Sequence, residues 1–409
     1  MCLQSTRGDN RSKMRVLSVT AQKPCSTGSG VYLTEVVRSL AKMGVSQAVV
    51  AGVTREDRVD MPEGVTVYPV YFSSEKLPYP VVGMSDEMPY TSTRYRDMTE
   101  EMAGQFKAAF LEVLDEVIEK ENPDIILCHH LYYLTALIRA HYPAKKVYGF
   151  CHNTDLRQME SILFERNFIR QEIPKLDRIF ALQEAQKEKI KKIYPVSEKQ
   201  MTVIGTGYNS EVFKKTGIKS SRKDGKIRMI FAGKITQKKG VKSLLRALNL
   251  LDYEKEKIQL ILAGGAGNLV EYEEIKELAD GCRYPVVFAG CVTQSRLAEL
   301  YNDCDIFVLP SMYEGLPLTV IESLACGDRV VMTKLEGIAE WLADMVPDAD
   351  IRYVLPPGMK GTDEPLEEEL PAFESRLAEA LREAIEEKDT KECDVSRISW
   401  QKIAREVIR

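Results

Sequence analysis

Two glutamates, Glu314 and Glu322, are separated by seven residues in a segment that could place both at one site. Glu314 comes after the run at 305–309, which is apolar except for Asp305 and is typical of a buried strand. Pro317 suits the first turn of a helix that carries Glu322. Backbone N–H groups at a helix start can bind a phosphate or a sugar hydroxyl. The pattern predicts that one carboxylate reaches a sugar and the other a ribose diol, although two solvated residues would satisfy the same spacing.

Two lysines in a glycine-flanked turn could bind a diphosphate. Residues 232–241 include Gly233, Lys234, Lys239 and Gly240, between a predicted strand and a predicted helix. Glycine permits a tight turn, and lysine can neutralise a diphosphate whose negative charge grows as a sugar leaves. We expect this role for Lys234 and Lys239; solvated loop lysines are the alternative interpretation.

A glycine-rich loop offers a further phosphate-binding candidate. Gly28, Ser29 and Gly30 lie between the first predicted strand and the first predicted helix. Backbone N–H groups in such a turn point toward an anion, so the position suits a phosphate, while a simple tight connection is the alternative.

Three of the four histidines follow predicted strands, where parallel sheets place their ligand sites. His152 follows one strand, and His129 and His130 follow another. A histidine at a strand end often serves only packing or hydrogen bonding, so its position leaves both roles open. We expect His130 and Arg157 to lie on the side of a cleft that would bind the acceptor of a transferred group. We expect Asp155 to be the N-cap of the next helix.

Strands and helices alternate in two series along the chain, which predicts two doubly wound parallel-sheet α/β domains. The expected strands are at 15–20, 47–51, 123–128, 146–151, 178–182 and 201–204, and then at 227–232, 258–263, 286–289, 305–309 and 329–333. Residues 205–225, rich in Gly, Ser and Lys, are expected to be a linker. Two such domains would face each other across a cleft lined by strand ends.

Composition narrows the class of protein. The 409 residues carry 56 Lys and Arg against 61 Asp and Glu, a formal net charge of −5, so a nucleic-acid-binding protein is not expected. Nine cysteines without a C-x-x-C pair favour a reducing compartment over a disulfide framework. No secretory leader and no apolar run of membrane-spanning length is recognised, so we expect a cytoplasmic protein. Peripheral membrane contact and the oligomeric state stay open.

The segment at 311–322 resembles the retaining glycosyltransferases of family 4, which have the GT-B fold of two Rossmann-like domains. Their E-x7-E signature matches Glu314 and Glu322, and the likeness extends over most of 226–345. The resemblance implies that Glu314 contacts the donor sugar, Glu322 the ribose, and that His152 lies near the donor sugar. It implies further donor contacts at Gly28, Ser29, Gly30, Gly233, Val292, Gly315, Leu316, Pro317 and Leu318.

The sequence departs from the family at one catalytic position. The family pattern G-R-x-x-x-K-G matches Lys239, whereas Lys234 stands where arginine is usual. Lysine lacks the planar guanidinium that binds a phosphate with two parallel hydrogen bonds. A catalytically degenerate protein that only binds nucleotide sugar is therefore one alternative, and a GT-B nucleotide-sugar epimerase is another.

By resemblance, the protein transfers a hexose or N-acetylhexosamine from a nucleotide diphosphate sugar to a hydroxyl acceptor. The acceptor would be a small molecule, a lipid or a glycan. UDP is favoured over GDP or ADP, and neither a cofactor nor a metal is required. The expected organisation is a disordered start at 1–13, an acceptor domain at 14–205, a nucleotide-sugar domain at 206–390, and a helix at 391–409 that packs back on the first domain.

Overall fold

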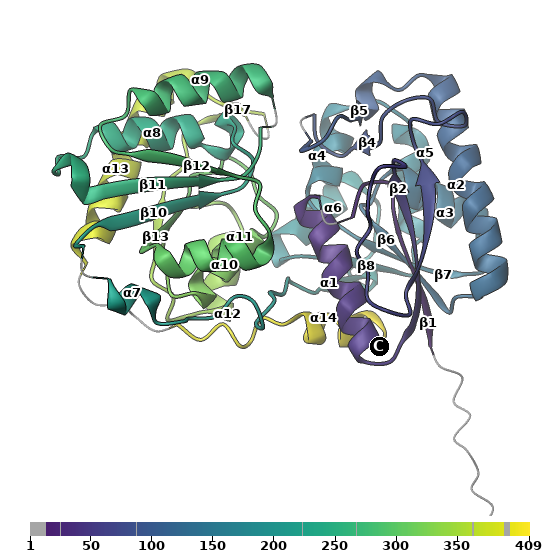
Figure 1. Ribbon diagram of the computed structural model, residues 1–409. Coiled ribbons are helices and arrows are strands. Elements are labelled where there is room, and N and C mark those ends of the chain that lie inside the picture. Colours follow the sequence, from purple (N-terminus) through teal and green to yellow (C-terminus); the bar gives the residue numbers. More distant parts are fainter. Residues whose placement is uncertain are drawn as a thin grey trace, which may run out of the picture.

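The computed structural model describes residues 14–24, 26–86, 88–222, 224–266, 268–361, 364–387 and 393–409. The start expected at 1–13 lies outside these residues, as do Cys25 of the glycine-rich loop and Lys223 of the expected linker. Figure 1 shows two α/β domains side by side, the first in purple and blue and the second mainly in green. The predicted architecture of two parallel-sheet domains is confirmed.

The first domain contains a parallel sheet of seven strands in the order β3-β2-β1-β6-β7-β8-β9. The strands are β1 (Arg15–Thr20), β2 (Ser46–Val53), β3 (Thr66–Tyr71), β6 (Ile125–His129), β7 (Lys146–Phe150), β8 (Arg178–Ala181) and β9 (Met201–Val203). Its helices are α1 (Gly28–Lys42), α2 (Glu100–Glu121), α3 (Tyr133–His141), α4 (Thr154–Ser161), α5 (Arg166–Glu172) and α6 (Glu184–Ile193). The described part of residues 73–97 forms the short strand pair β4 (Val82–Gly83) and β5 (Thr93–Arg94) and a 3-10 turn at Tyr95–Asp97.

The second domain contains a parallel sheet of six strands in the order β12-β11-β10-β13-β14-β15. The strands are β10 (Ile227–Ala232), β11 (Ile258–Ala263), β12 (Val286–Gly290), β13 (Ile306–Leu309), β14 (Arg329–Thr333) and β15 (Ile351–Val354). Its helices are α8 (Val241–Asn249), α9 (Leu269–Asp280), α10 (Gln294–Asp303), α11 (Leu318–Ala325), α12 (Ile338–Met345) and α13 (Leu370–Glu386). Two further short strands, β16 (Met359–Lys360) and β17 (Glu364–Pro365), pair antiparallel before α13.

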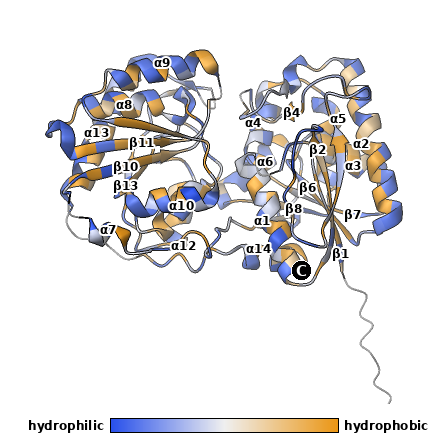
Figure 2. Cartoon of the chain, viewed as in Figure 1, coloured by the Kyte–Doolittle hydropathy of each residue, from blue (hydrophilic) through white to orange (hydrophobic). Residues whose placement is uncertain are grey.

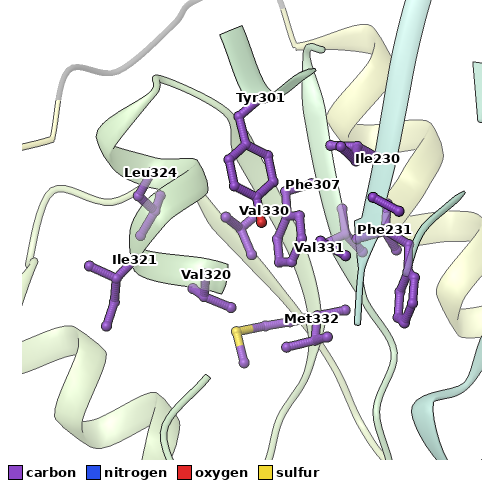
Figure 3. Close-up of a cluster of buried hydrophobic side chains, with 14 of the residues drawn as sticks. Ile230, Phe231, Tyr301, Phe307, Val320, Ile321, Leu324, Val330, Val331 and Met332 are labelled. Carbon is purple, nitrogen blue, oxygen red and sulfur yellow. The ribbon is translucent and has the colours of Figure 1, made fainter. Parts of the chain in front are cut away.

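The central strands are buried because helices cover both faces of each sheet. In the second domain Tyr301, Phe307 and Phe231 are fully buried, and they lie among aliphatic side chains of β14 and α11 (Figure 3). Figure 2 shows the same division by hydropathy, with mostly hydrophobic strands and helices that carry one polar side. Among the described residues, we find no helix with both the length and the apolar character needed to cross a membrane.

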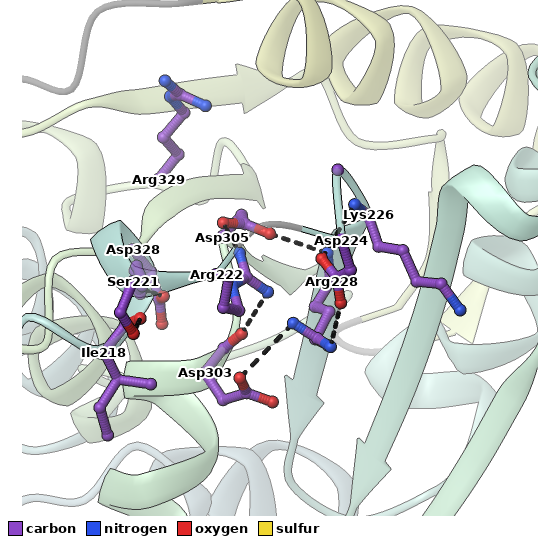
Figure 4. A network of polar contacts seen from close by, with 12 residues as sticks. Ile218, Ser221, Arg222, Asp224, Lys226, Arg228, Asp303, Asp305, Asp328 and Arg329 are labelled. Atoms are coloured by element: carbon purple, nitrogen blue, oxygen red, sulfur yellow. Dashed lines mark hydrogen bonds and ion pairs between the residues drawn. The ribbon is translucent and has the colours of Figure 1, made fainter.

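Polar contacts fasten the expected linker to the second domain. The linker includes the short helix α7 (Ile218–Ser221). Arg222 follows this helix, and its guanidinium forms an ion pair with Asp305, the residue before β13 (Figure 4). The other oxygen of Asp305 accepts a hydrogen bond of 2.8 Å from the backbone N–H of Arg228. Lys219 pairs with the buried Asp328. These contacts fix the linker on the side of the sheet opposite the strand carboxyl ends.

The last described helix returns to the first domain. α14 (Trp400–Val407) packs beside α1, as Figure 1 also shows. The rings of Trp400 and Tyr32 meet edge to face with 4.9 Å between centroids, a favourable aromatic geometry. Arg178 of β8 forms an ion pair with Glu406. The closing helix thus crosses back as the resemblance implies.

Candidate active site

The strand order reverses between β1 and β6 in the first sheet and between β10 and β13 in the second. Loops leave such a point on opposite sides of the sheet, so a crevice forms at the strand carboxyl ends. The loops after β1, β7, β10 and β13 line one cavity of about 530 Å³ between the two domains. The fold therefore brings together four segments that are far apart in the sequence.

Most of the predicted site residues line this cavity. They are Gly28, Ser29, His152, Arg157, Gly233, Lys234, Lys239, Glu314, Gly315, Leu316, Pro317, Leu318 and Glu322. Gly30, Val292 and His130 do not line it. Gly30 lies in the first turn of α1, where its N–H donates to the side chain of the capping Thr27 at 3.2 Å. His130 is buried behind Ser29, and Val292 lies beyond Gly290 at the end of β12.

Glu314 and Lys239 form an ion pair at the cavity. The Nζ atom of Lys239 lies 2.6 Å from Oε1 of Glu314, and both side chains are partly buried. Lys239 ends a short 3-10 turn after β10, while Glu314 follows β13, which lies beside β10 in the sheet. Charge-assisted hydrogen bonds of this length are strong, so the pair holds both side chains at the cavity wall.

Glu322 lies in the second turn of α11 and is almost completely buried. Burial raises the pKa of its carboxyl group to about 8, and the negative charge of Glu35 on α1 adds to the increase. Both effects disfavour the charged form. Since Glu322 also lines the cavity, its carboxyl group is positioned to exchange a hydrogen bond with a bound hydroxyl.

Two glycines let the turns after β10 and β11 approach each other closely. Gly264 has a φ of 149°, and a Cβ atom added there would lie 1.8 Å from the backbone oxygen of Gly233. No side chain fits this contact, so the backbone of both turns borders the cavity directly. A ligand phosphate can therefore come close to the main chain at this point.

Two helices begin at the cavity. α1 begins at Gly28 and is capped by Thr27, and α11 begins at Leu318 after Pro317, which occupies the N-cap position itself. The first N–H groups of a helix have no partner within the helix, and its dipole favours a negative charge there. The cavity thus presents anion-binding backbone groups from both domains.

Three histidines form a cluster beside the cavity. Nε2 of His152 lies 3.0 Å from Nδ1 of His129, and Nε2 of His130 lies 3.1 Å from Oγ of Ser29. Burial lowers the pKa of His152 to about 3 and the pKa values of His129 and His130 well below the usual range. All three rings are therefore neutral at physiological pH.

A bridge between the domains, which the sequence analysis missed, joins the loops that carry His152 and Glu314. Asn153 donates from Nδ2 to the backbone oxygen of Glu314 at 2.9 Å, and the hydroxyl of Tyr313 donates to the backbone oxygen of Asn153 at 3.0 Å. Asn153 has a φ of 73°, a conformation that asparagine tolerates better than most residues. The one feature of the sequence that could have indicated this contact is the position of Asn153 directly after the candidate site residue His152.

The prediction that Asp155 caps the helix is wrong. Asn153 is the N-cap residue of α4, and Asp155 lies inside the first turn, fully buried. Its Oδ2 atom accepts hydrogen bonds from the backbone N–H groups of Leu131 at 2.7 Å and His152 at 3.2 Å. Asp155 therefore ties the loop after β6 to the loop after β7, which fixes the histidine cluster.

The first-domain side of the cavity combines one cation with apolar side chains. Arg157 lies 3.9 Å from Asp86, and Met84 and Met88 line the wall beside it. Gln22, after β1, lies within hydrogen-bond range of Ser29 (3.4 Å) and also lines the cavity. Only Arg157 of these was expected, because the other side chains come from irregular segments.

Two family models match the chain in adjoining stretches. "Glycosyltransferase Family 4" matches residues 26–212 and "Glycosyl transferases group 1" matches residues 213–361. Together they contain every predicted site residue and all the residues that line the cavity except Gln22. The chain belongs to the family 4 glycosyltransferases.

Individual relatives of this family 4 protein share part of its length. An uncharacterized glycosyltransferase of Methanocaldococcus jannaschii is 29% identical over 172 residues, which are 40% of this chain and 44% of that protein. The chain thus spans less than half the length of this curated relative.

Solved structures resemble the family member over nearly its whole length. Sucrose-phosphate synthase of Thermosynechococcus elongatus has a TM-score of 0.68 at 15% identity over 97% of each chain. The Anabaena protein HepE, solved with UDP and glucose, has a TM-score of 0.61 at 14% identity over 97% of this chain and 98% of that one. These similarities establish the GT-B fold.

Proposed function

We propose that this protein is a retaining glycosyltransferase that moves a hexose or N-acetylhexosamine from a UDP-sugar to a hydroxyl acceptor. One observation supports the proposal most directly: cations and helix starts from both domains, together with the carboxylates of Glu314 and Glu322, border a single cavity. A nucleotide diphosphate sugar requires that combination, because it carries two phosphates, a ribose diol and a sugar. UDP is favoured by the likeness to HepE, whose structure holds UDP.

The phosphates are assigned to the second domain. Lys234 and Lys239 supply positive charge, and the turns at Gly233 and Gly264 supply close backbone contact. Glu322 is assigned to the ribose and Glu314 to the sugar. In this scheme the Lys239–Glu314 pair opens when the donor enters, since Lys239 then turns to the diphosphate and Glu314 to the sugar hydroxyls.

The chemistry follows from the groups at the cavity. The bond between the sugar C1 and the diphosphate oxygen breaks, and the acceptor oxygen bonds to C1 from the same face. The acceptor proton passes to the departing diphosphate, because the low pKa of His152 makes it a weak base. Lys234 and Lys239 stabilise the charge that develops on the diphosphate, so the scheme requires no metal ion.

We also assign the protein to the cytoplasm. Among the described residues, the seven cysteines are all unpaired, and four of them are buried. Unpaired cysteines are typical of a reducing compartment.

A thermal-shift screen against UDP, GDP, ADP and TDP tests the donor site. We expect selective stabilisation by UDP, lost in Lys239→Ala and Glu322→Ala. Lys242→Ala is the matched control, because Lys242 pairs with Glu274 outside the cavity and should leave the UDP shift unchanged. No stabilisation by any nucleotide would refute the proposal.

Product analysis tests the reaction itself. With a UDP-sugar and a panel of hydroxyl acceptors, a retaining transferase gives a product with the anomeric configuration of the donor. Inversion would contradict the mechanism. Conversion of the sugar without an acceptor would show an epimerase, and UDP binding without turnover would show a nucleotide-sugar-binding protein.

A further inference from the structure

His129 is a buried histidine outside the cavity whose ring contacts the ring of His152. Nδ1 of His129 lies 3.0 Å from Nε2 of His152, and the two ring planes differ by only 12°. The ring centroids are 5.2 Å apart, so the two nitrogens lie between the rings and the rings meet edge to edge. This is the geometry of an N–H···N hydrogen bond. Phe150 stacks on His129 with 4.8 Å between ring centroids and holds it in this orientation.

One of the two rings must donate and the other must accept. A neutral imidazole carries a single N–H, on either Nδ1 or Nε2, and its other nitrogen is an acceptor. Burial lowers the pKa values of both histidines, so neither ring carries a second proton at physiological pH. The direction of the hydrogen bond therefore fixes the tautomer of both rings.

The second nitrogen of His129 decides the direction. Nε2 of His129 is buried and has no hydrogen-bond partner among the residues that the structure describes. An N–H group left unpaired in such a place loses its hydrogen bond to water, which is costly. The proton of His129 therefore lies on Nδ1, which donates to Nε2 of His152.

We propose that His129 is a positioning residue that holds His152 in the tautomer with its proton on Nδ1. His152 lines the cavity, so Nδ1–H is the ring group left to donate a hydrogen bond to an oxygen of the bound sugar. This role in ligand binding rests on the proposed function, whereas the tautomer itself does not. A hydrogen-bond donor that is fixed before the ligand enters spares the ring a reorganisation on binding.

The neighbouring His130 serves a different group. Its Nε2 atom contacts Oγ of Ser29 at 3.1 Å, and its Nδ1 atom is buried without a hydrogen-bond partner in the described part of the chain. The same reasoning places the proton of His130 on Nε2, directed at Ser29. The two adjacent histidines at the end of β6 thus orient donors on two different cavity walls.

Imidazole 15N NMR tests the tautomer without any ligand. Only four histidines occur, so selective 15N labelling gives few signals, and the His152→Asn variant identifies those of His152. We expect the Nδ1–H tautomer for His152 in the wild type and in His129→Asn, whose amide N–H can replace Nδ1–H. His129→Phe should shift His152 to the Nε2–H tautomer, and His141→Asn, on the exposed surface, should change nothing. An Nε2–H tautomer of His152 in the wild type overturns the proposal, even if His129→Phe fails to fold.

The affinities for UDP-glucose and UDP, measured by calorimetry, test the effect on the ligand. We expect His129→Phe to lower the affinity for UDP-glucose about tenfold relative to UDP, the effect of one lost hydrogen bond to a polar partner, and His129→Asn to restore most of it. An unchanged ratio of the two affinities in His129→Phe overturns the role in sugar binding. Absence of UDP binding in every form would instead refute the proposed function, and the NMR result would still decide the tautomer.

Discussion

Replacing Glu322 with glutamine should stabilise the protein at pH 8 while it weakens the binding of UDP. Burial raises the pKa of this carboxyl group from its ordinary 4.5 to about 8. As the pH rises from 5 to 8, the unfolded chain releases this proton and the folded protein retains it. The wild type therefore loses free energy of unfolding across that window, and full stability is present only below pH 4.5.

The magnitude follows from the two pKa values. One pKa unit corresponds to about 1.4 kcal/mol, and the range from pH 5 to 8 covers most of the interval between 4.5 and about 8. Relative to the glutamine variant, the wild type should lose roughly 3 kcal/mol over this range. Glutamine has no charge to bury, so the pH dependence of this position disappears in the variant.

Urea unfolding at several pH values measures the difference. The chain has two tryptophans, Trp341 in the second domain and Trp400 on α14, so a Trp400→Phe background makes the fluorescence report on the domain that carries Glu322. Glu299→Gln is the control, because Glu299 forms an exposed pair with Arg296 and should give no pH-dependent difference. Parallel stability curves for wild type and Glu322→Gln between pH 5 and 8 would refute the reasoning.

Three further outcomes are expected. Lys239→Ala should weaken UDP binding about 10- to 100-fold in calorimetry, since a hydrogen bond to a charged group is lost; wild-type affinity would contradict its assignment to the phosphates. Tyr313→Phe removes the hydroxyl that reaches Asn153, so urea unfolding should show a loss of about 1 kcal/mol and sugar transfer should slow; an unchanged rate would show that the bridge has no role in turnover. Gly264→Ala should lose about 2–4 kcal/mol in the same unfolding assay, because its Cβ would overlap the oxygen of Gly233; wild-type stability would show that the two turns can separate freely.

The sequence predicts the centres of the two sheets better than their edges. Central strands such as β13, and β10 from Met229 onward, are covered on both faces and consist of continuous apolar runs. Of the four edge strands, β9 and β12 were expected from the sequence, but β3 and β15 were not. β3 contains Pro69 and partly exposed side chains, and β15 is short with three partly exposed residues, so neither resembles a buried strand. α3 was also missed, because its residues from Tyr133 to Arg139 are all buried and no polar face marks the helix.

Some features of the candidate site could be predicted from the sequence, and others depend on how the chain folds. Residues within one segment, such as Glu314 and Glu322, could be recognised because their spacing along the chain is the signal. The contact of Lys239 with Glu314 depends on β10 and β13 being neighbours in the sheet, which no local pattern encodes. Asn153 was overlooked for the same reason, since its partners lie in the other domain.

The return of α14 to α1 makes the first domain depend on residues that are synthesised much later. About 200 residues separate Val203, the end of β9, from Trp400. At roughly 5–20 residues per second, a ribosome takes on the order of 10–40 s to make them. Until then Tyr32 and its apolar neighbours on α1 lack their cover, although every strand of the first sheet has already been made. The apolar face of α1 around Tyr32 is therefore exposed, and open to aggregation, while the second domain is still being translated.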